Sequence, residues 1–538
     1  MSLTKINRQE NEEWWRGAVI YQIYPRSFLD TNGDGIGDLP GIIEKLDYIA
    51  DLDVDAIWIS PFFPSPMKDF GYDVSNYRSV DPLFGTLEDF DTLLEKAHKR
   101  GLKIIIDLVL SHTSDQHPWF IQSRRNKKND KSDWYVWADP NINDQGNPAP
   151  PNNWASVFGG SAWTYDKQRK QYFLHNFLKE QPDLNFHNPY VQEEILDICR
   201  FWLDRGVDGF RLDVVNFYFH DPLLRNNPTQ TPNADFATQF EAETPYSRQK
   251  HIYDKSRPEN LDFIRKLREV MDTYTNRFTV GEIGDDHPYD RAAEYTQGQS
   301  RLNTCYNTHL MSGTHKKLTA DLIRLPVETF TKTKSESWPS WAFSNHDVVR
   351  AASRWHEEGN GFTQNPALSK LLIALLGCLP GTIFMYQGEE LGLPEAQIPF
   401  EDLQDPWAKE TWPIWQGRDG CRTPLPWNKE NHAGFSSVRP WLPIPKTHFP
   451  LNIAAQKQDK NSTLNFSRRF LKWRRNHQEI IKGKIEFIDT TNENIIIFRR
   501  YDLKNETNCI FNLKNTNTET KDLKLGPYDF KIDGFNEE

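Results

Sequence analysis

The feature that most constrains the fold is a recurring unit: a short apolar, β-branched run that ends in polar residues and is followed by an amphipathic stretch. This alternation of strand and helix is expected of parallel βαβ units. One candidate strand, near Leu302–Asn307, is weaker than the others. The clear runs are Val19–Phe28, Ala56–Phe63, Lys103–Leu110, Gly209–Val215, Phe278–Ile283, Trp341–Asp347 and Thr382–Glu390.

Helix signals lie between these runs. Thr86-Leu87-Glu88-Asp89 has the pattern of a capping box and predicts a helix that ends near Arg100-Gly101. Asn188-Pro189 has the pattern of an N-cap followed by a first helical residue, before a helix over Val191–Arg205. With the weaker strand included, the repeats predict an α/β protein built on a (β/α)₈ TIM barrel.

Two segments depart from this rhythm and predict additional domains. Residues 113–184 are rich in loops, and Pro148-Ala149-Pro150-Pro151 should break any regular element there. After residue 482 helical periodicity is lost, and runs such as Ile495-Ile496-Ile497-Phe498 favour an antiparallel β-sandwich. The expected division is 1–112 for the first part of the barrel, 113–184 for a domain inserted after strand three, 185–481 for the rest of the barrel and 482–538 for the C-terminal β domain.

Charge and cysteine content exclude several classes of partner. The net charge of −11 leaves no basic excess to neutralise phosphates, so neither a nucleic acid nor a membrane surface is expected as a partner. The cysteines are few and odd in number, which fits a reducing compartment better than a disulfide framework. The N-terminus, Met1–Arg8, lacks an apolar signal region. We expect a cytoplasmic protein, either a monomer or a homodimer.

Acidic residues stand near the ends of several predicted strands. They are Asp107, Asp213, Glu282 and Asp347. In a TIM barrel these ends converge on one face, where reactive groups gather. One such Asp alone could be a turn residue, but several suggest a shared site. Neighbouring buried carboxylates have pKa values that move apart, which suits the nucleophile and proton donor of a retaining glycosidase.

Five motifs, spread along the chain in a fixed order, carry a resemblance to the α-amylase family of glycoside hydrolases, family 13, over nearly the whole length. Within this family the chain is similar to bacterial exo-acting α-glucosidases with transglucosylation activity. The motifs are Asp107-Leu108-Val109-Leu110-Ser111-His112, Gln181-Pro182-Asp183-Leu184-Asn185, Gly209-Phe210-Arg211-Leu212-Asp213, Val280-Gly281-Glu282-Ile283 and Ser344-Asn345-His346-Asp347.

The resemblance implies catalytic roles. Asp213 would be the nucleophile, Glu282 the general acid/base and Asp347 the carboxylate that stabilises the distorted sugar. Arg211, two residues before Asp213 on the same strand face, should keep the nucleophile ionised. Glu282 should lie in a less compensated setting, since it must begin protonated. His112 and His346 would hydrogen-bond the hydroxyls of the glucose in subsite −1.

Other matches concern the end of the sugar that is bound. Asp69-Phe70-Gly71-Tyr72-Asp73 resembles an exo-α-glucosidase motif in which Asp69 and Tyr72 enclose the non-reducing glucose. Gly417–Pro424 resembles the segment that supplies Arg418 opposite Asp69, and a salt bridge there would close the pocket. Phe158 and Phe177 resemble its aromatic walls, although both could simply be core rings.

The segment Asp30–Asp38 presents oxygen side chains at alternating positions, as a hard cation requires. In the family this loop binds calcium or magnesium away from the catalytic groups. The implied structural ligands are Asp30, Asn32, Asp34, Ile36 through its carbonyl, and Asp38, and a solvated Asx-turn is the alternative. Ser111 replaces the Asn that ligates a second calcium in many α-amylases. No organic cofactor is expected.

The expected activity is a retaining exo-α-glucosidase that hydrolyses maltose-like or sucrose-like substrates through a covalent glucosyl-enzyme and transfers glucose to acceptor hydroxyls. Val214 instead resembles the oligo-1,6-glucosidases, which remain an alternative. A glucoside isomerase of the trehalose synthase or sucrose isomerase type is another, but Arg324-Leu325-Pro326-Val327-Glu328 matches the isomerase loop poorly. A catalytically dead, membrane-anchored relative is disfavoured, because all three acids are retained.

Overall fold

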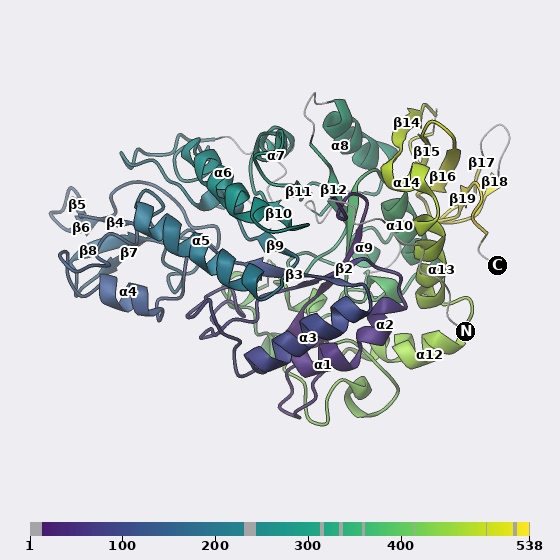
Figure 1. The fold of residues 1–538 in the computed structure, drawn as a ribbon, viewed down its shortest axis with the longest axis horizontal. Helices are drawn as coiled ribbons and strands as arrows, with labels where there is room; N and C mark the ends of the chain where they lie inside the picture. Colours follow the sequence, from purple (N-terminus) through teal and green to yellow (C-terminus); the bar gives the residue numbers. More distant parts are fainter. Residues whose placement is uncertain are drawn as a thin grey trace.

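The computed structural model describes residues 13–230, 244–311, 317–332, 337–357, 361–413, 415–490, 492–519 and 524–536. The polar N-terminal stretch and the two ends of the predicted domain division therefore lie outside the described residues. The chain forms a barrel surrounded by helices, with a smaller sheet-containing region at one side and a C-terminal sheet at the other (Figure 1).

The barrel is closed by eight parallel strands in the order β1-β13-β12-β11-β10-β9-β3-β2. The predicted fold class is therefore confirmed, and so is the weaker strand, which pairs with both of its neighbours as β11. The strands are β1 (Val19–Ile23), β2 (Ala56–Ile59), β3 (Lys103–Leu108), β9 (Gly209–Leu212), β10 (Phe278–Glu282), β11 (Thr304–Asn307), β12 (Ser340–Ala342) and β13 (Thr382–Tyr386).

Helices cover the outside of this barrel, as Figure 1 shows for α3, α5 and α6. Thr86 and Asp89 form the predicted capping box of α3, and Asn188 caps α5 by accepting a hydrogen bond from the N–H of Tyr190. The main helices are α1 (Leu39–Glu44), α2 (Leu46–Ala50), α3 (Leu87–Lys99), α5 (Pro189–Asp204), α6 (Glu259–Asp272), α7 (Pro288–Thr296), α8 (Ala320–Lys332), α9 (Ala351–Arg354), α10 (Pro366–Cys378), α11 (Pro406–Thr411), α12 (Ile453–Gln458), α13 (Thr463–Arg475) and α14 (Gln478–Lys482).

Alternate residues of the strands fill the barrel interior. Ile20, Trp58, Ile105, Val280 and Phe384 belong to a core cluster of their own, separate from the larger core between barrel and helices. Side chains on one face of a strand recur every second residue. The interior rows therefore continue, one step further along the strands, into Gln22 after Ile20, Asp107 after Ile105, and Glu282 after Val280.

The segment between β3 and α5 contains α4 (Pro118–Ser123) and two small antiparallel sheets. One sheet has the order β4-β8-β7, from Trp137–Ala138, Gln171–Leu174 and Trp163–Asp166. The other pairs β5 (Asn141–Ile142) with β6 (Pro148–Ala149). The expectation that the prolines exclude a regular element is thus wrong for Pro148, because a strand of only two residues at a sheet edge does not require its missing N–H.

The C-terminal region is an antiparallel sheet in the order β14-β15-β16-β19, with the pair β17–β18 beside it. A buried arginine of this sheet joins it to the helices around the barrel: Arg500 donates to the carbonyl of Cys378, at the end of α10, at 2.6 Å. The strands are β14 (Lys484–Ile488), β15 (Ile495–Tyr501), β16 (Glu506–Asn512), β17 (Thr518–Glu519), β18 (Lys524–Leu525) and β19 (Phe530–Ile532).

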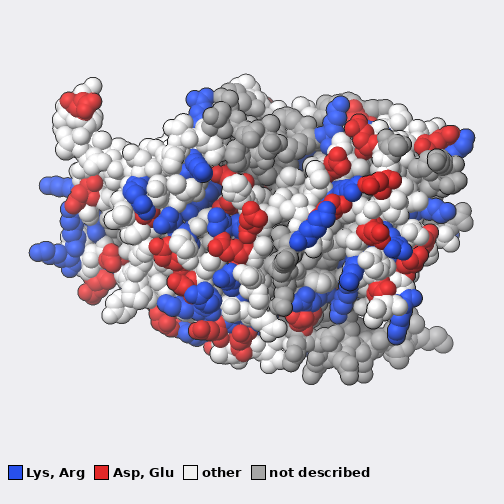
Figure 2. All heavy atoms as spheres, turned by 90° about the horizontal axis from the view of Figure 1, so that it is seen from above, with Lys and Arg blue, Asp and Glu red and all other residues white. Residues whose placement is uncertain are grey.

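The molecular surface carries both signs of charge. On the face shown in Figure 2, the lysine and arginine side chains of the described residues are interspersed with aspartate and glutamate. No helix in the described part of the chain has the length and apolar character needed to cross a lipid bilayer.

Candidate active site

Arg211 connects three acidic side chains at the carboxyl ends of neighbouring strands. Its guanidinium donates to Asp107 at 2.9 Å, to Asp213 at 2.7 Å and to Glu282 at 2.5 Å. All four residues are buried, and Arg211 is only 1% exposed. Parallel registry produces this cluster, because Asp107 of β3 lies beside Arg211 of β9, which lies beside Val280 of β10.

The cluster contains more carboxylates than cations, which raises the affinity for protons. Burial raises the pKa of Asp107 to about 6 and that of Asp213 well above its usual value, against the attraction of Arg211. The neighbouring charge of Glu282 raises both further. The structure therefore differs from one expectation: Arg211 also contacts Glu282 directly, so its charge is shared among the three carboxylates.

Val214, immediately after Asp213, has a left-handed backbone with φ 35° and ψ 50°. A β-branched residue rarely adopts this conformation, which costs about 1–3 kcal/mol and often marks a functional site. Strand β9 ends at Leu212, and the chain turns at Val214, so Asp213 lies between the strand and the turn. The turn also directs the N–H of Val214 toward Glu282 Oε2, 3.4 Å away.

Asp347, which follows β12, lies on the opposite side of the site among cations. Arg422 Nη2 is 2.7 Å and Arg418 Nη1 3.3 Å from Asp347 Oδ1. Burial would raise the pKa of Asp347, but His346, Arg422 and Arg418 lower it below its usual value. Because burial lowers the pKa of His346 itself to about 3, the arginines provide this attraction at neutral pH.

Arg418 also forms the predicted salt bridge with Asp69, at 2.9 Å between buried side chains. Asp405, which sequence reasoning missed, holds the same guanidinium with both carboxylate oxygens, at 2.9 and 3.0 Å. It also caps α11 by accepting a hydrogen bond from the N–H of Trp407. No strand end or motif marks Asp405; only its position one residue before Pro406 suggests an N-cap.

The predicted sugar-binding histidines meet at Tyr72. The Tyr72 hydroxyl lies 2.5 Å from His346 Nε2, and His112 Nε2 donates to the Tyr72 carbonyl at 3.0 Å. Ser111 donates to His112 Nδ1 at 2.8 Å, so its hydroxyl orients the histidine. Burial lowers the pKa of His112 to about 4. Gln181 lies in one of the sequence motifs, which predicted no role for it. Its amide nitrogen donates to Asp69 Oδ2 at 3.2 Å.

The aromatic residues Phe158 and Phe177 are half-buried and lie 5.6 Å apart between ring centroids. Phe177 contacts His112 at 5.4 Å, and Phe158 lies 5.3 Å from the guanidinium carbon of Arg418. Trp407, not predicted from the sequence, packs on Phe158 at 4.8 Å. These rings therefore border the charged groups and are not remote parts of the core.

The predicted cation loop lies directly before α1, and its side chains hydrogen-bond within the loop, to the N–H of Gly41 and to Ser436. Asp30 accepts hydrogen bonds from the N–H groups of Gly33 and Gly35, and Asp38 caps α1. Asn32 and Asp34 bond each other at 3.2 Å. Among the described residues, no group of three or more His, Cys, Asp or Glu side chains is arranged to hold a metal.

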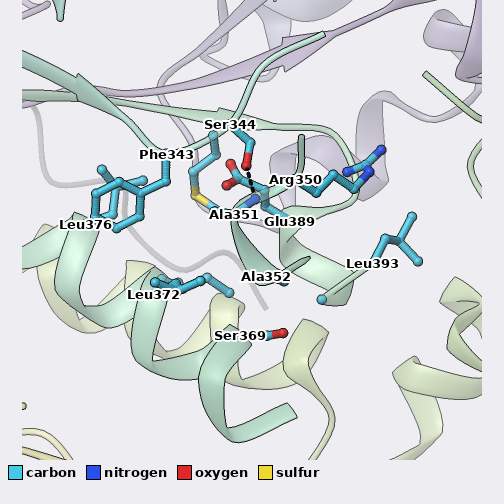
Figure 3. A pocket seen from close by; sticks show the side chains of 13 residues that line it. Phe343, Ser344, Arg350, Ala351, Ala352, Ser369, Leu372, Leu376, Glu389 and Leu393 are labelled. Carbon is cyan, nitrogen blue, oxygen red and sulfur yellow. Dashed lines mark hydrogen bonds between the residues drawn. The ribbon is translucent and has the colours of Figure 1, made fainter. Parts of the chain in front are cut away.

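A separate small pocket borders the segment that follows β12 (Figure 3). Its walls include Phe343, Leu372 and Leu376, with the buried carboxyl of Glu389 beside Ser344. Ser344 accepts a hydrogen bond from the N–H of Ala351 and so fixes the loop that contains Asp347. None of the predicted site residues lines this pocket, so it is separate from the carboxylate cluster.

A TIM barrel with clustered carboxylates at its strand ends has the groups that hydrolysis of a glycosidic bond requires. Residues 22–483 match the family model "Alpha amylase, catalytic domain". The chain therefore belongs to the α-amylase family.

Relatives span nearly the full length of the chain. It is 52% identical to "Probable alpha-glucosidase" of Rhizobium meliloti (strain 1021), over 96% of this chain and 92% of the relative. It is 36% identical to an oligo-1,6-glucosidase of Parageobacillus thermoglucosidasius, over 96% and 95%. The crystal structure of the alpha-glucosyl transfer enzyme XgtA matches with a TM-score of 0.92 and 50% identity, over 96% of this chain and 99% of that chain.

Proposed function

We propose that the protein is a retaining exo-α-glucosidase that hydrolyses short α-glucosides, maltose-like or sucrose-like, and transfers glucosyl groups to acceptor hydroxyls. The observation that carries this proposal is the buried Arg418–Asp69 ion pair beside the carboxylate cluster. A pocket closed by such a pair has room for one glucose beyond the scissile bond, which favours action at the non-reducing end.

The proposed chemistry is a double displacement. Asp213 attacks the anomeric carbon while Glu282 protonates the leaving oxygen, and Glu282 then deprotonates a water or an acceptor hydroxyl that releases the glucose. One guanidinium, that of Arg211, contacts both carboxylates, at 2.7 and 2.5 Å. This supports the short spacing that a retaining mechanism needs.

The other groups bind and stabilise the sugar in this proposal. Asp347 remains ionised, since Arg418 and Arg422 lower its pKa, and it can stabilise positive charge at the anomeric carbon. His112, His346 and Tyr72 hydrogen-bond the glucose hydroxyls. Phe158 and Phe177 form the walls.

Asp213→Asn is the direct test of the mechanism. The variant keeps the size of the side chain but removes the nucleophile, so release of p-nitrophenol from p-nitrophenyl α-glucoside should fall by at least about 10³-fold. Asp139→Asn, at an exposed position, is the matched control. Undiminished turnover by Asp213→Asn would exclude the proposed nucleophile.

The main alternative is an oligo-1,6-glucosidase, favoured by Val214 and by the relatives of that name. An isomerase is less well supported, because residues 324–328 lie within α8, where Arg324 pairs with Glu328 at 2.7 Å. A panel of maltose, isomaltose, sucrose, trehalose and maltotriose, with products resolved by chromatography, separates these activities. Much faster cleavage of isomaltose than of maltose would favour the alternative.

We also propose that the loop Asp30–Asp38 holds a structural Ca²⁺ or Mg²⁺ through Asp30, Asn32, Asp34, Asp38 and the carbonyl of Ile36. Its donors are all oxygens, as a hard cation prefers, and binding requires Asp30, Asp34 and Asp38, which are not grouped around one point in this structure, to converge on the ion. Burial and, to a smaller extent, the charge of Asp30 raise the pKa of Asp38. A bound cation would relieve that repulsion and tie the loop to the start of α1.

A further inference from the structure

Gln22, on the first barrel strand β1, contacts the ring of His346. Its amide nitrogen lies 2.7 Å from His346 Nδ1 and 3.2 Å from the hydroxyl of Ser60. Gln22 is 1% exposed, and its Oε1 has no hydrogen-bond partner among the residues that the structure describes. The sequence motifs gave Gln22 no role.

The position of the His346 ring is fixed. Tyr72 stacks on the ring with a centroid distance of 5.4 Å and an angle of 3°, and Tyr24 stacks at 5.7 Å and 19°. The two nitrogens of His346 therefore face different partners. Nδ1 faces Gln22, whereas Nε2 faces the Tyr72 hydroxyl at 2.5 Å and Asp347 Oδ2 at 3.2 Å.

With the amide of Gln22 oriented as in the structure, these contacts fit one proton arrangement. An amide nitrogen donates and cannot accept, so His346 Nδ1 must offer its lone pair to Gln22. Nε2 then carries the proton and donates to the Tyr72 hydroxyl, with Asp347 Oδ2 3.2 Å away. The Tyr72 hydroxyl keeps its own proton for Asp107 Oδ2, 3.1 Å away.

The opposite tautomer fails at two contacts. With the amide of Gln22 turned over, Oε1 could accept a proton from Nδ1. The amide N–H groups would then occupy the position where the buried oxygen has no partner, and unpartnered buried N–H groups are rarer than unpartnered oxygens. The bare Nε2 would also face Asp347, whose pKa is lowered and which is therefore ionised. Two lone pairs would oppose each other at 3.2 Å.

We propose that Gln22 is a positioning residue that fixes His346 as the neutral Nε2–H tautomer, and so makes it a permanent hydrogen-bond donor beside Asp347. An imidazolium would place an Nδ1–H against the amide donor of Gln22, so the contact also opposes a second proton. The charges around the ring are those of Asp347, Arg422, Arg211 and Arg418. Gln22 thereby keeps an uncharged ring next to an ionised carboxylate.

The test is ¹⁵N NMR of the full chain labelled in its histidines, with His346→Asn to identify the resonance. The wild-type ring should show a protonated Nε2 and an unprotonated Nδ1. In Gln22→Glu, the new carboxylate should accept from Nδ1, and the ring should gain a second proton. In Gln22→Met, Nδ1 should lose its donor, so the share of the Nδ1–H tautomer should rise above the wild-type level although Asp347 still disfavours it.

Gln456→Glu is the matched control, since Gln456 is also buried but hydrogen-bonds Leu391, Leu451 and Leu464. It should leave the His346 signal unchanged. An Nδ1–H tautomer in the wild type, or an unchanged ring in Gln22→Glu, would overturn the proposal.

The consequence for the reaction rests on the proposed function and has a separate readout. Gln22→Met should lower kcat/KM on p-nitrophenyl α-glucoside by about 10- to 100-fold, as for other residues that fix a histidine tautomer. Unchanged kcat/KM together with a raised share of the Nδ1–H tautomer would overturn the positioning role. A wild-type chain without α-glucosidase activity would instead refute the proposed function, and the spectrum would still report on Gln22.

Discussion

Arg418 illustrates how a single side chain in this site depends on neighbours from distant parts of the chain. Its guanidinium contacts Asp69, Asp405 and Asp347 at 2.9 to 3.3 Å, and all of these groups are largely buried. Removing one partner from a buried charge is costly, because the remaining charge loses its compensation. The attraction of Arg418 holds the pKa of Asp405 at about 2, although burial opposes it.

Asp405→Ala should therefore lower the free energy of unfolding by about 3 kcal/mol. Without the two-point contact, Arg418 is free to turn from Asp69, so KM for maltose should rise at least tenfold while kcat changes less. Steady-state kinetics and urea denaturation measure these effects. Asp221→Ala is the control, because the buried Asp221 holds the exposed guanidinium of Arg225 in similar geometry. Equal KM changes in both variants would contradict the prediction.

Asp107 gives a second prediction for a single residue. Burial raises its pKa to about 6 in the folded protein, against about 3.9 for an unfolded aspartate. Between these values the folded chain binds more protons, so the wild-type free energy of unfolding falls as pH rises.

Asp107→Asn removes this titration. Its stability relative to wild type should therefore increase from about pH 4 to about pH 6 and then level off, by roughly 3 kcal/mol in total, since one pKa unit is about 1.4 kcal/mol. Activity should fall, because Asp107 accepts a hydrogen bond from Arg211. Urea denaturation across this pH range measures the difference, and a difference that is independent of pH would refute the interpretation.

At the scale of elements, the sequence predicted which segments become barrel strands but placed their ends too late. The run Val19–Phe28 ends as a strand at Ile23, because Tyr24-Pro25 starts a 3₁₀ turn. The run Gly209–Val215 ends at Leu212, where Val214 takes a left-handed conformation. Apolar character continued past both ends because these residues are buried in loops.

The residues of the site were likewise predicted only in part. Acids at strand ends were predictable, since their positions derive from the strands. Asp405 was not, because its loop reaches Arg418 only through the tertiary fold. The charge balance around Arg211 was also beyond sequence reasoning, because it depends on which side of the guanidinium each neighbouring strand presents.

The loop Asp30–Asp38 gives a prediction for a whole element. If it holds a divalent cation, EDTA should lower the Tm by several degrees and added Ca²⁺ or Mg²⁺ should restore it, through preferential binding to the folded state. Asp34→Asn should abolish this response and leave kcat nearly unchanged, because the side chains of the loop hydrogen-bond within the loop, to Gly41 and to Ser436 rather than to the carboxylate cluster. Asp144→Asn, at an exposed position elsewhere, should respond as the wild type does. A Tm that is insensitive to EDTA would exclude the ion.

At the scale of the whole molecule, a buried arginine joins the C-terminal sheet to the helices around the barrel. Arg500 of β15 donates to the carbonyls of Cys378 and Gly483, at 2.6 and 2.9 Å. Arg474 of α13 donates to Gly377 and to Gly17, at 2.9 and 2.8 Å, and so ties α13 to α10 and to the segment before β1. Loss of the Arg500 guanidinium would leave buried carbonyls without their charged donor.

Arg500→Met should destabilise this junction by about 3 kcal/mol, because several buried carbonyls lose a charged donor. Calorimetry should resolve an early transition for the C-terminal sheet, with the barrel unfolding later. Arg499→Met, whose guanidinium pairs with Glu486 and Glu506 on the exposed face, should keep one transition. A single unshifted transition in Arg500→Met would show that the junction does not depend on this contact.

The barrel closes where β1 pairs with β13, with Val19 beside Ile383 and Gln22 beside Tyr386. A chain growing on the ribosome therefore exposes one edge of its first strand until residue 386 has left the exit tunnel. The early strands can pair with each other during synthesis, but the ring cannot be completed. Premature termination before Thr382 would release a sheet with two open edges, which is a substrate for aggregation and for chaperones.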